Sequence, residues 1–282
     1  MSTTTMTRGA QASRLRYAVS DWRTLMKRNL LTYIRKPDLL VFSTIQPVMF
    51  VLLFVYVWGG AMSRALPADI PYVDFLMPGI FVQTAIFAAL QTGVGLAEDL
   101  QKGLIDRFRS LPMARSAVLA ARAAADTVVI MFQVILMFVV AYLVGYRIHE
   151  GPAQALLGFV GAVAIGYAIT WVAAFAGLSL KTVEAVQAAT FTLVFPLVFA
   201  SSAFVPDTDF PGWLQAWSHI NPVSIWAQTL RVLTLGDIYR NAPSQLVGVV
   251  PSLGTLLWQS GAWLVGILLL FVPLGVRVYR RT

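Results

Sequence analysis

The chain contains no cysteine, and only 12% of its 282 residues carry a formal charge. The first absence excludes disulfide bonds and thiolate-ligated metal sites. The second excludes a water-soluble surface, because a soluble domain is roughly one quarter charged. Apolar residues take the place of the charges: 58% of the chain is hydrophobic and the mean hydropathy is +0.72. These values indicate a protein that crosses a membrane several times.

Motifs for nucleotide binding and for catalysis are also absent from the sequence. A phosphate-binding loop of the form G-x-x-x-x-G-K-[ST] needs a lysine directly after a glycine, and the four lysines follow Met, Arg, Gln and Leu. The two histidines, His149 and His219, lie far apart and form no H-E-x-x-H motif, so a zinc site is not expected. No G-x-S-x-G elbow is present either. We therefore expect neither a catalytic site nor a metal or cofactor bound by this chain.

Long uncharged runs predict an all-α membrane protein with six transmembrane helices. About 20 apolar residues span a bilayer core, and an isolated span must be helical to satisfy its backbone. The predicted spans lie at residues 39–62, at 75–97, at 127–146, within 151–180, at 185–206, and within 241–276 from about 254 onward. None of these runs contains an ionisable side chain. This disfavours a secondary transporter, whose coupling ions or protons need ligands near the midplane.

The distribution of basic residues predicts which end of each span faces the cytoplasm. If the N-terminus is cytoplasmic, 17 of the 21 Lys and Arg lie on the inner side and 4 lie in outer loops. Inner loops of membrane proteins carry this excess. We therefore expect both termini in the cytoplasm, and the same bias explains the net charge of +8 without a nucleic-acid partner.

Two segments are predicted to lie at the membrane without spanning it. Residues 13–36 repeat apolar side chains at helical spacing with Lys and Arg on the other flanks. This pattern predicts a helix in the inner interface, with a plain cytosolic helix as the alternative. Residues 207–241 are apolar but interrupted by Pro211, Gly212 and Pro222. Because broken helices at membrane depth are tolerated only inside protein or along a cavity, we expect an outer re-entrant hairpin before the last span.

The segment 97–122, AEDLQKGLIDRFRSLPMARSAVLAAR, carries three acids and five Lys or Arg between two apolar runs. Four apolar side chains recur in it at spacings of four, four and three, which predicts an amphipathic helix that ends at Pro112. They are Leu100, Leu104, Phe108 and Leu111. A solvated loop, the alternative, would not need this register. We therefore interpret the segment as a docking element for a cytosolic partner.

Several polar side chains near or within the spans have two possible roles. Arg122 and Asp126 stand one helical turn apart and can pair near the interface, either for structure or as part of transport. Polar and aromatic side chains inside apolar spans are candidates for a transport pathway, although helix packing is their more common role. These candidates are Gln83, Phe87, Gln91, Gln133, Thr190, Phe191 and Thr192. The pair Ala173 and Gly177 allows close helix approach without indicating which interface it serves.

Residues 98–119, EDLQKGLIDRFRSLPMARSAVL, resemble the cytoplasmic signature of ABC-2-type export permeases. They are especially similar to the daunorubicin/doxorubicin resistance subgroup, in which an ED…G…RFRSLP…R pattern recurs. A second segment, NPVS at 221–224 followed by Arg231 and Gly236, is similar to the N-P-[LV]-[ST]…R…G element of the same family. The six-helix layout agrees, so the resemblance covers most of residues 1–282, which would form one transmembrane domain.

The resemblance implies a permease half that is not itself an enzyme. Such permeases pair as dimers, here a homodimer in preference to a heterodimer, and recruit a separate cytosolic ATP-binding subunit that holds ATP and Mg²⁺. The implied activity is export of a hydrophobic or amphiphilic compound, such as a drug or antibiotic, across the inner (plasma) membrane of a bacterium. A lipid or glycolipid exporter and a non-transporting membrane assembly protein are the alternatives.

The resemblance also implies which residues act. Residues 97–115 would form the coupling helix, with Phe108 and leucines as buried anchors, arginines as charged donors, and Gly103 allowing close approach. The coupling residues carried over by position are Glu98, Asp99, Gly103, Arg107, Phe108, Arg109, Leu111, Pro112 and Arg115. The outer motif contributes Asn221, Pro222 and Arg231.

Overall fold

A computed structural model of the protein describes residues 22–31, 33–35, 37–104 and 115–281, and these described residues are helical with turns and contain no strand. The first helix covers residues 22–31 and 33–35. The long helices that follow are α2 (Pro37–Leu52), α4 (Tyr72–Gln101), α6 (Arg115–Val144), α7 (Pro152–Leu180), α8 (Val183–Phe199) and α13 (Leu253–Arg281). Short elements link them: η1 (Leu53–Val57), α3 (Gly59–Met62), η2 (Ser63–Ala65), η3 (Asp207–Asp209), α9 (Gly212–Ile220), α10 (Pro222–Leu235), α11 (Asp237–Arg240) and α12 (Ser244–Val247).

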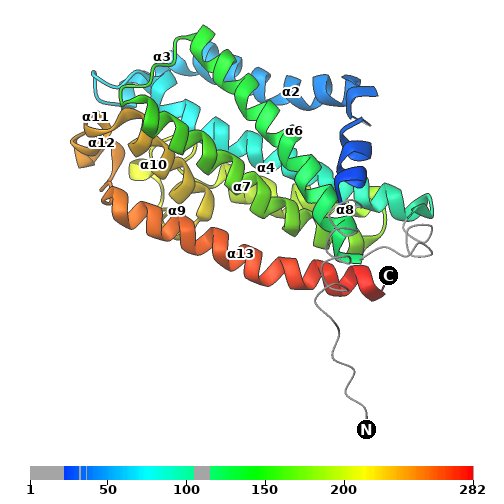
Figure 1. The fold of residues 1–282 in the computed structure, drawn as a ribbon. Coiled ribbons are helices and arrows are strands. Elements are labelled where there is room, and N and C mark those ends of the chain that lie inside the picture. The colour runs from blue at the N-terminus through cyan, green and yellow to red at the C-terminus, as the bar shows by residue number, and fades with distance from the viewer. Residues whose placement is uncertain (1–21, 32, 36, 105–114, 282) are drawn as a thin grey trace, which may run out of the picture.

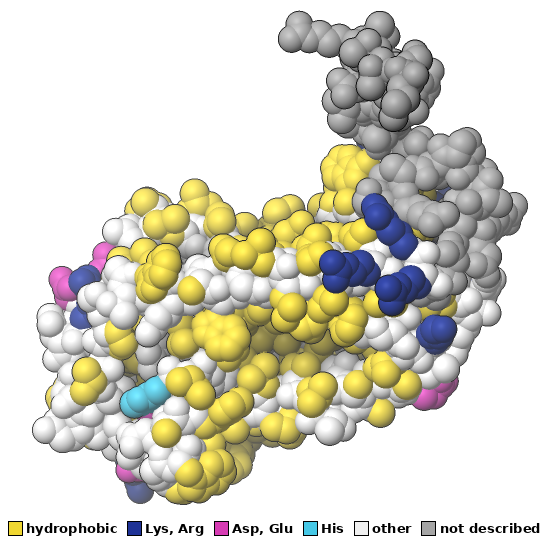
Figure 2. All heavy atoms as spheres, turned by 90° about the horizontal axis from the view of Figure 1, so that it is seen from below, with side chains coloured by type: hydrophobic (Ala, Val, Ile, Leu, Met, Phe, Trp, Pro, Cys, Tyr) yellow, Lys and Arg dark blue, Asp and Glu magenta, His cyan; other side chains and the backbone are white. Residues whose placement is uncertain are grey.

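The helices form an elongated bundle with two distinct ends (Figure 1). At one end lie residues 22–35, the end of α4, the start of α6 and the C-terminus of α13; we call this the basic end. At the other, distal end lie α3, α11 and α12. In the view from below, Lys and Arg gather at the basic end, and an apolar surface covers the middle of the bundle (Figure 2). Bands of this kind suit a protein whose middle faces lipid.

Four of the described helices, α4, α6, α7 and α13, are long and apolar enough to cross a membrane. A fifth span results if the helices at 43–57 and 59–65, which meet at a bend of 59°, count as one. The helix α8 is apolar but only 17 residues long, because it ends at Phe199, well before the end of the predicted span at 206. The structure thus supports a multi-pass helical membrane protein, whereas the count of six spans stays a prediction.

The helix α4 is the core of the bundle and packs against α2, α6, α7, α8 and α10. Its most apolar window is 83% buried, against 6% for that of α13. Small residues let α7 approach it closely: a Cβ at Gly93 would lie 2.6 Å from the carbonyl oxygen of Ala173, and one at Gly177 would lie 2.9 Å from the Cα of Gly93. The small pair Ala173 and Gly177 therefore serves the contact between α4 and α7.

The structure corrects the expectation that the spans lack ionisable side chains. Both α4 and α6 begin earlier than the uncharged runs suggested, so they include Asp74 and Asp126. Both carboxylates are buried, as are Asp207 and Arg231. Asp74 accepts a hydrogen bond from the backbone N–H of Arg147 at 2.9 Å and lies 3.0 Å from Nε2 of His149. The buried charges are thus held by partners inside the protein.

Candidate functional site

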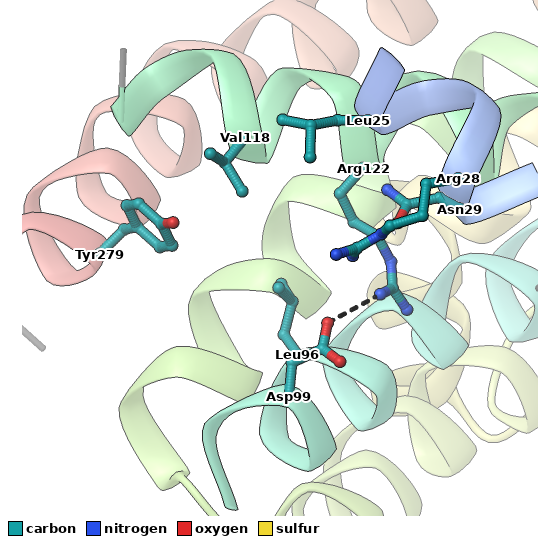
Figure 3. A pocket seen from close by; sticks show the side chains of 8 residues that line it. All are labelled: Leu25, Arg28, Asn29, Leu96, Asp99, Val118, Arg122 and Tyr279. Carbon is teal, nitrogen blue, oxygen red and sulfur yellow. Dashed lines mark hydrogen bonds and ion pairs between the residues drawn. The ribbon is translucent and has the colours of Figure 1, made fainter. Parts of the chain in front are cut away.

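A small pocket of about 20 Å³ opens at the basic end, among the first helix, α4, α6 and α13 (Figure 3). Its lining residues are Leu25, Arg28, Asn29, Leu96, Asp99, Val118, Arg122 and Tyr279. A pocket of this size holds about one water molecule. It brings together four segments that are distant in sequence, and the guanidinium of Arg122 points to the carboxylate of Asp99 across it.

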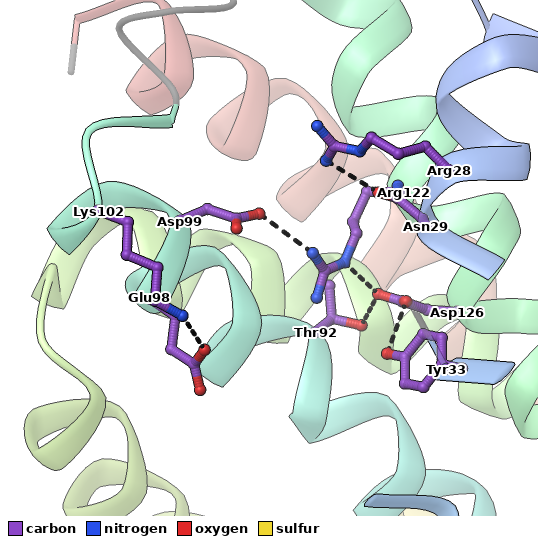
Figure 4. A network of polar contacts seen from close by, with 9 residues as sticks. All are labelled: Arg28, Asn29, Tyr33, Thr92, Glu98, Asp99, Lys102, Arg122 and Asp126. Carbon is purple, nitrogen blue, oxygen red and sulfur yellow. Dashed lines mark hydrogen bonds and ion pairs between the residues drawn. The ribbon is translucent and has the colours of Figure 1, made fainter. Parts of the chain in front are cut away.

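Arg122 joins α6 to α4 through two carboxylates (Figure 4). Its Nε donates to Oδ2 of Asp126 at 3.1 Å, and its Nη1 donates to Oδ2 of Asp99 at 3.2 Å. The predicted ion pair between Arg122 and Asp126 is confirmed. Its second partner, Asp99, belongs to the segment that the sequence predicts as a docking element, and it is 23 residues away in the chain.

Asp126 collects donors from three segments of the chain. Besides Arg122, the hydroxyl of Thr92 on α4 donates to its Oδ2 at 2.6 Å, and the phenol of Tyr33 in the first helix donates to its Oδ1 at 3.0 Å. Burial, together with the charge of Asp126, raises the pKa of Tyr33, so the phenol stays protonated and able to donate. One carboxylate therefore holds the first helix, α4 and α6 together.

The packing around Arg122 depends on a glycine. A Cβ added at Gly95 would overlap with Nη2 of Arg122. Any larger residue at this position of α4 would push the guanidinium out of its place between Asp99 and Asp126. The sequence pattern carried no signal for this requirement, because Gly95 lies inside an apolar run.

The start of the predicted coupling segment differs from the expectation. The helix α4 continues through Gln101, so Glu98 and Asp99 lie on its last turn and do not begin a separate helix. The chain then turns at Gly103, whose φ is +65°, a conformation that glycine adopts without strain. A Cβ there would meet nothing within 4 Å. Within the described residues, Gly103 therefore makes the turn after α4, and the close approach to a partner subunit at this glycine stays a prediction.

The rest of that segment can be followed only in part. The predicted helix with its apolar stripe was wrong at its start, because Leu100 and Leu104 lie on opposite sides of the turn at Gly103. The predicted coupling residues Arg107, Phe108, Arg109, Leu111 and Pro112 lie outside the described residues, as does the side chain of Arg115. Lys102 bonds to Glu98 at 2.8 Å, and because both are exposed the pair contributes little stability.

The outer motif is a set of buried packing contacts. Asn221 caps α10: its Oδ1 accepts from the N–H of Val223 at 2.9 Å, and its Nδ2 donates to the carbonyl of Leu197 on α8 at 2.8 Å. Pro222 is the first residue of the helix, where its missing N–H costs nothing. The motif thus fixes the start of α10 against the end of α8.

Arg231, which the charge count placed in an outer loop, is fully buried in α10. Its Nε donates to the carbonyl of Phe75 at 2.8 Å and its Nη2 to that of Ala203 at 2.6 Å. The guanidinium also lies 3.7 Å from the centroid of the Phe75 ring, within the range of a cation–π contact. The segment expected to form an outer re-entrant hairpin contains two short helices, α9 and the 14-residue α10, and the burial of α10 is what removes Arg231 from the surface.

The seven pathway candidates do not converge on one site. Gln83 and Phe87 line a second pocket, of about 10 Å³, between α2 and α4. The buried Gln133 donates from Nε2 to the hydroxyl of Ser43 at 2.7 Å, so it serves helix packing. Gln91 is exposed on α4, whereas α8 carries the partly buried Thr190 and the exposed Phe191 and Thr192.

A cluster of five phenylalanines joins the end of α2 to the end of α8. Its members are Phe50, Phe54, Phe195, Phe199 and Phe204. The ring centroids of Phe50 and Phe199 are 5.7 Å apart, and those of Phe54 and Phe204 are 5.2 Å apart, within the range of favourable aromatic pairs. Sequence reasoning missed this cluster, although two pairs spaced by four residues were visible.

Residues 20–235 match the protein-family model described as ABC-2 type transporter. The chain belongs to the ABC-2 type transporter family. It is 30% identical to the daunorubicin resistance ABC transporter permease protein DrrB1 of Streptomyces coeruleorubidus, over 93% of this chain and 87% of that one. It is 25% identical to the probable doxorubicin resistance ABC transporter permease protein DrrC of Mycobacterium tuberculosis, over 92% and 88%. It is 28% identical to the putative transport permease ycf38 of Cyanophora paradoxa, over 77% and 75%.

These matches confirm the resemblance to the daunorubicin/doxorubicin resistance permeases. The family match of this ABC-2 protein begins before Tyr33 and ends at Leu235. It therefore includes the polar network at the basic end, the aromatic cluster and all of α10, whereas α13 lies beyond it.

Proposed function

We propose that this ABC-2 protein is the membrane permease half of an ATP-driven exporter for a hydrophobic or amphiphilic compound such as a drug. A separate cytosolic ATP-binding subunit would supply the energy through residues 97–115. One observation carries the proposal: a single buried helix, α4, runs from the distal end to Asp99, at the edge of the predicted coupling segment. At 30 residues it is about 45 Å long, longer than the roughly 30 Å hydrocarbon core.

Both ends of α4 are attached to other elements by polar contacts. At the basic end, Asp99 and Thr92 bond to Arg122 and Asp126 of α6. At the distal end, the phenol of Tyr72 donates to the carbonyl of Phe204 at 3.0 Å. A displacement of the segment after Asp99 would therefore move α4 as a rigid unit. This movement would be passed to the aromatic cluster through Phe204. We propose that the aromatic cluster closes the pathway at the distal end.

We propose that the basic end faces the cytoplasm of a bacterium and that the protein lies in its inner (plasma) membrane. The excess of Lys and Arg on that side supports this orientation. The ATP-binding subunit would hold ATP and Mg²⁺, since this sequence has no phosphate-binding loop. A cytoplasmic basic end also brings the predicted coupling segment to the side where such a subunit resides.

We further propose that the pathway lies where a second permease copy faces α2, α4 and α8. The helix α8 exposes Phe191 and Leu193 at 63% and 71%, and the exposed Gln91 of α4 lies on the same surface strip of α4 as Phe87. A homodimer is our proposal. A heterodimer of two related permeases is the alternative, because proteins named DrrB and DrrC in Mycobacterium tuberculosis both match this chain.

The proposal is tested by replacing Phe108 and Arg109 together with alanine and co-expressing the chain with its ATP-binding subunit. We expect the subunit to be lost on purification and daunorubicin export to stop. Arg240→Ala is the matched control, since this distal arginine pairs with the exposed Asp237 on the surface of the described residues. Wild-type export and co-purification in the double variant, at normal expression, would refute the docking role. Movement of a fluorescent phospholipid but of no drug by the purified complex would favour the lipid exporter.

A further inference from the structure

Two enclosed polar atoms on α4 have no hydrogen-bond partner among the described residues. They are Oε1 of Gln83 and Oγ1 of Thr84. Both residues are buried, with exposed fractions of 2% and 1%. A buried threonine in a helix commonly bonds to the carbonyl four residues earlier, as Thr170 does to Gly166 at 3.0 Å. Leaving such a group without a partner costs about 1–3 kcal/mol. Two neighbouring cases in one helix therefore call for an explanation.

Helix packing, which explains Gln133, does not explain Gln83. Both glutamines are buried within apolar helices, and both were candidates for the pathway on sequence. Gln133 reaches the hydroxyl of Ser43 on α2 at 2.7 Å, so it contributes to the contact between α6 and α2. Gln83 lines a pocket shared with α2, and its amide oxygen has no partner among the described residues, whereas the amide nitrogen of Gln133 has an acceptor in Ser43.

The pocket beside Gln83 and Thr84 is small and uncharged. Its described lining residues are Gln46, Pro47, Gln83, Thr84 and Phe87. With about 10 Å³ of room, it admits one polar group the size of a water molecule. The ring of Phe87 and the ring of Pro47 form apolar walls. Phe87 and the exposed Gln91 continue the same face of α4 in successive turns, so a larger body attached to that polar group would lie along this face.

The unpartnered atoms define the chemistry of a ligand. An amide oxygen is an acceptor only, and a threonine hydroxyl can accept or donate. The missing partner is therefore a donor, a hydroxyl or an N–H. The uncharged lining gives an anionic group no counter-charge, which makes its burial costly. Phe50, three residues after Pro47 on α2, begins the aromatic cluster, so flat apolar rings find contacts one helical turn away.

We infer that Gln83 and Thr84 form the hydrogen-bonding subsite of the export pathway, where they select compounds that carry hydroxyl or N–H donors on an apolar, ring-containing body. The inference rests on the proposed export function and deepens it. A site built to hydrogen-bond a substrate discriminates strongly against analogues without the donor, because its own polar groups are then left unpaired. The pocket thus sets specificity, whereas the network at the basic end serves coupling.

The test compares daunorubicin with its O-methylated derivatives, which lack hydroxyl donors, in proteoliposomes that contain the permease and its ATP-binding subunit. We expect the wild-type complex to export daunorubicin about tenfold faster than the derivatives at low concentration. Gln83→Leu and Thr84→Val should each reduce this preference several-fold, and Thr84→Ser should retain it. Gln133→Leu and Thr170→Val are the comparisons, and they should keep the preference even where they lower thermal stability.

The outcomes separate the two proposals. Export of no compound by the wild-type complex would refute the proposed function. Export with an unchanged preference in Gln83→Leu and in Thr84→Val would overturn the subsite alone. A higher melting temperature of Gln83→Leu with unchanged preference would show that the pocket holds only water. If Gln83→Leu fails to fold, the shape-conserving Thr84→Val decides the question by the same measurement.

Discussion

Replacing Arg122 by methionine tests whether the polar network at the basic end holds the first helix, α4 and α6 together. The substitution keeps an unbranched apolar side chain and removes the charged guanidinium. Breaking a buried ion pair costs about 3–5 kcal/mol. We expect the lower limit, about 3 kcal/mol, because Asp126 keeps its donors from Thr92 and Tyr33 and the side chain of Asp99 is 20% exposed. For a chain of this size, that loss lowers Tm by roughly 6–12 °C.

The assay is thermal unfolding of the purified protein, arranged as a double-mutant cycle with Asp126→Asn. If the ion pair matters, the double variant is less destabilised than the sum of the two single variants, by about 1 kcal/mol or more. The single Arg122→Met variant should also export less drug at an unchanged content of ATP-binding subunit, since docking residues are intact. Strictly additive losses in the cycle would refute the reasoning.

Gly95 supplies an independent check on the same network. Gly95→Ala places a methyl group where Nη2 of Arg122 lies, so it should displace the guanidinium and destabilise the protein by about 1–3 kcal/mol. In an Arg122→Ala background the same methyl group has room, and the substitution should then be close to neutral. Equal effects of Gly95→Ala in both backgrounds would contradict the packing described here.

Two further predictions concern the interior of the bundle. Arg231→Lys should lower Tm, with a loss of about 1–3 kcal/mol in the free energy of unfolding. One ammonium cannot replace the guanidinium that donates to the carbonyls of both Phe75 and Ala203. An unchanged Tm would show that one of these bonds is dispensable. Gly177→Val should separate α7 from α4 at Gly93 and reduce the yield of folded protein in size-exclusion chromatography, whereas Gly261→Val, in open space on α13, should have little effect.

The family and the helical class could be predicted from the sequence because both depend on local patterns. The length of an apolar run predicts a helix, and the motif around residues 98–119 stands in one continuous stretch. The limits of the spans were less accurate. A run of uncharged residues ends at the first charge, but α4 and α6 continue past Asp74 and Asp126, whose charges are satisfied by partners from elsewhere in the chain.

The partners of individual side chains could not be predicted, since they depend on how distant segments meet. Asp126 was predicted to bond to Arg122, four residues away, but not to Tyr33, which precedes it by 93 residues. Gln83 and Gln133 both stand within apolar runs, yet Gln133 donates to Ser43 on α2, whereas Oε1 of Gln83 has no partner among the described residues. The count of charges assigned Arg231 to an outer loop. Its burial results from the contacts of α10 with α4, α7 and α13, which the sequence pattern does not indicate.

The link between α8 and η3 restricts how this sequence can change in evolution. Three contacts involve two consecutive residues of this link. Arg231 donates to the carbonyl of Ala203, and Gly79 leaves room for the same carbonyl. Tyr72 donates to the carbonyl of Phe204. An inserted or deleted residue here would shift all three contacts at once. The segment before α13 is more open to solvent, since its Val249 is 86% exposed. Insertions among functional relatives should therefore accumulate around Val249 and be excluded from the link after α8.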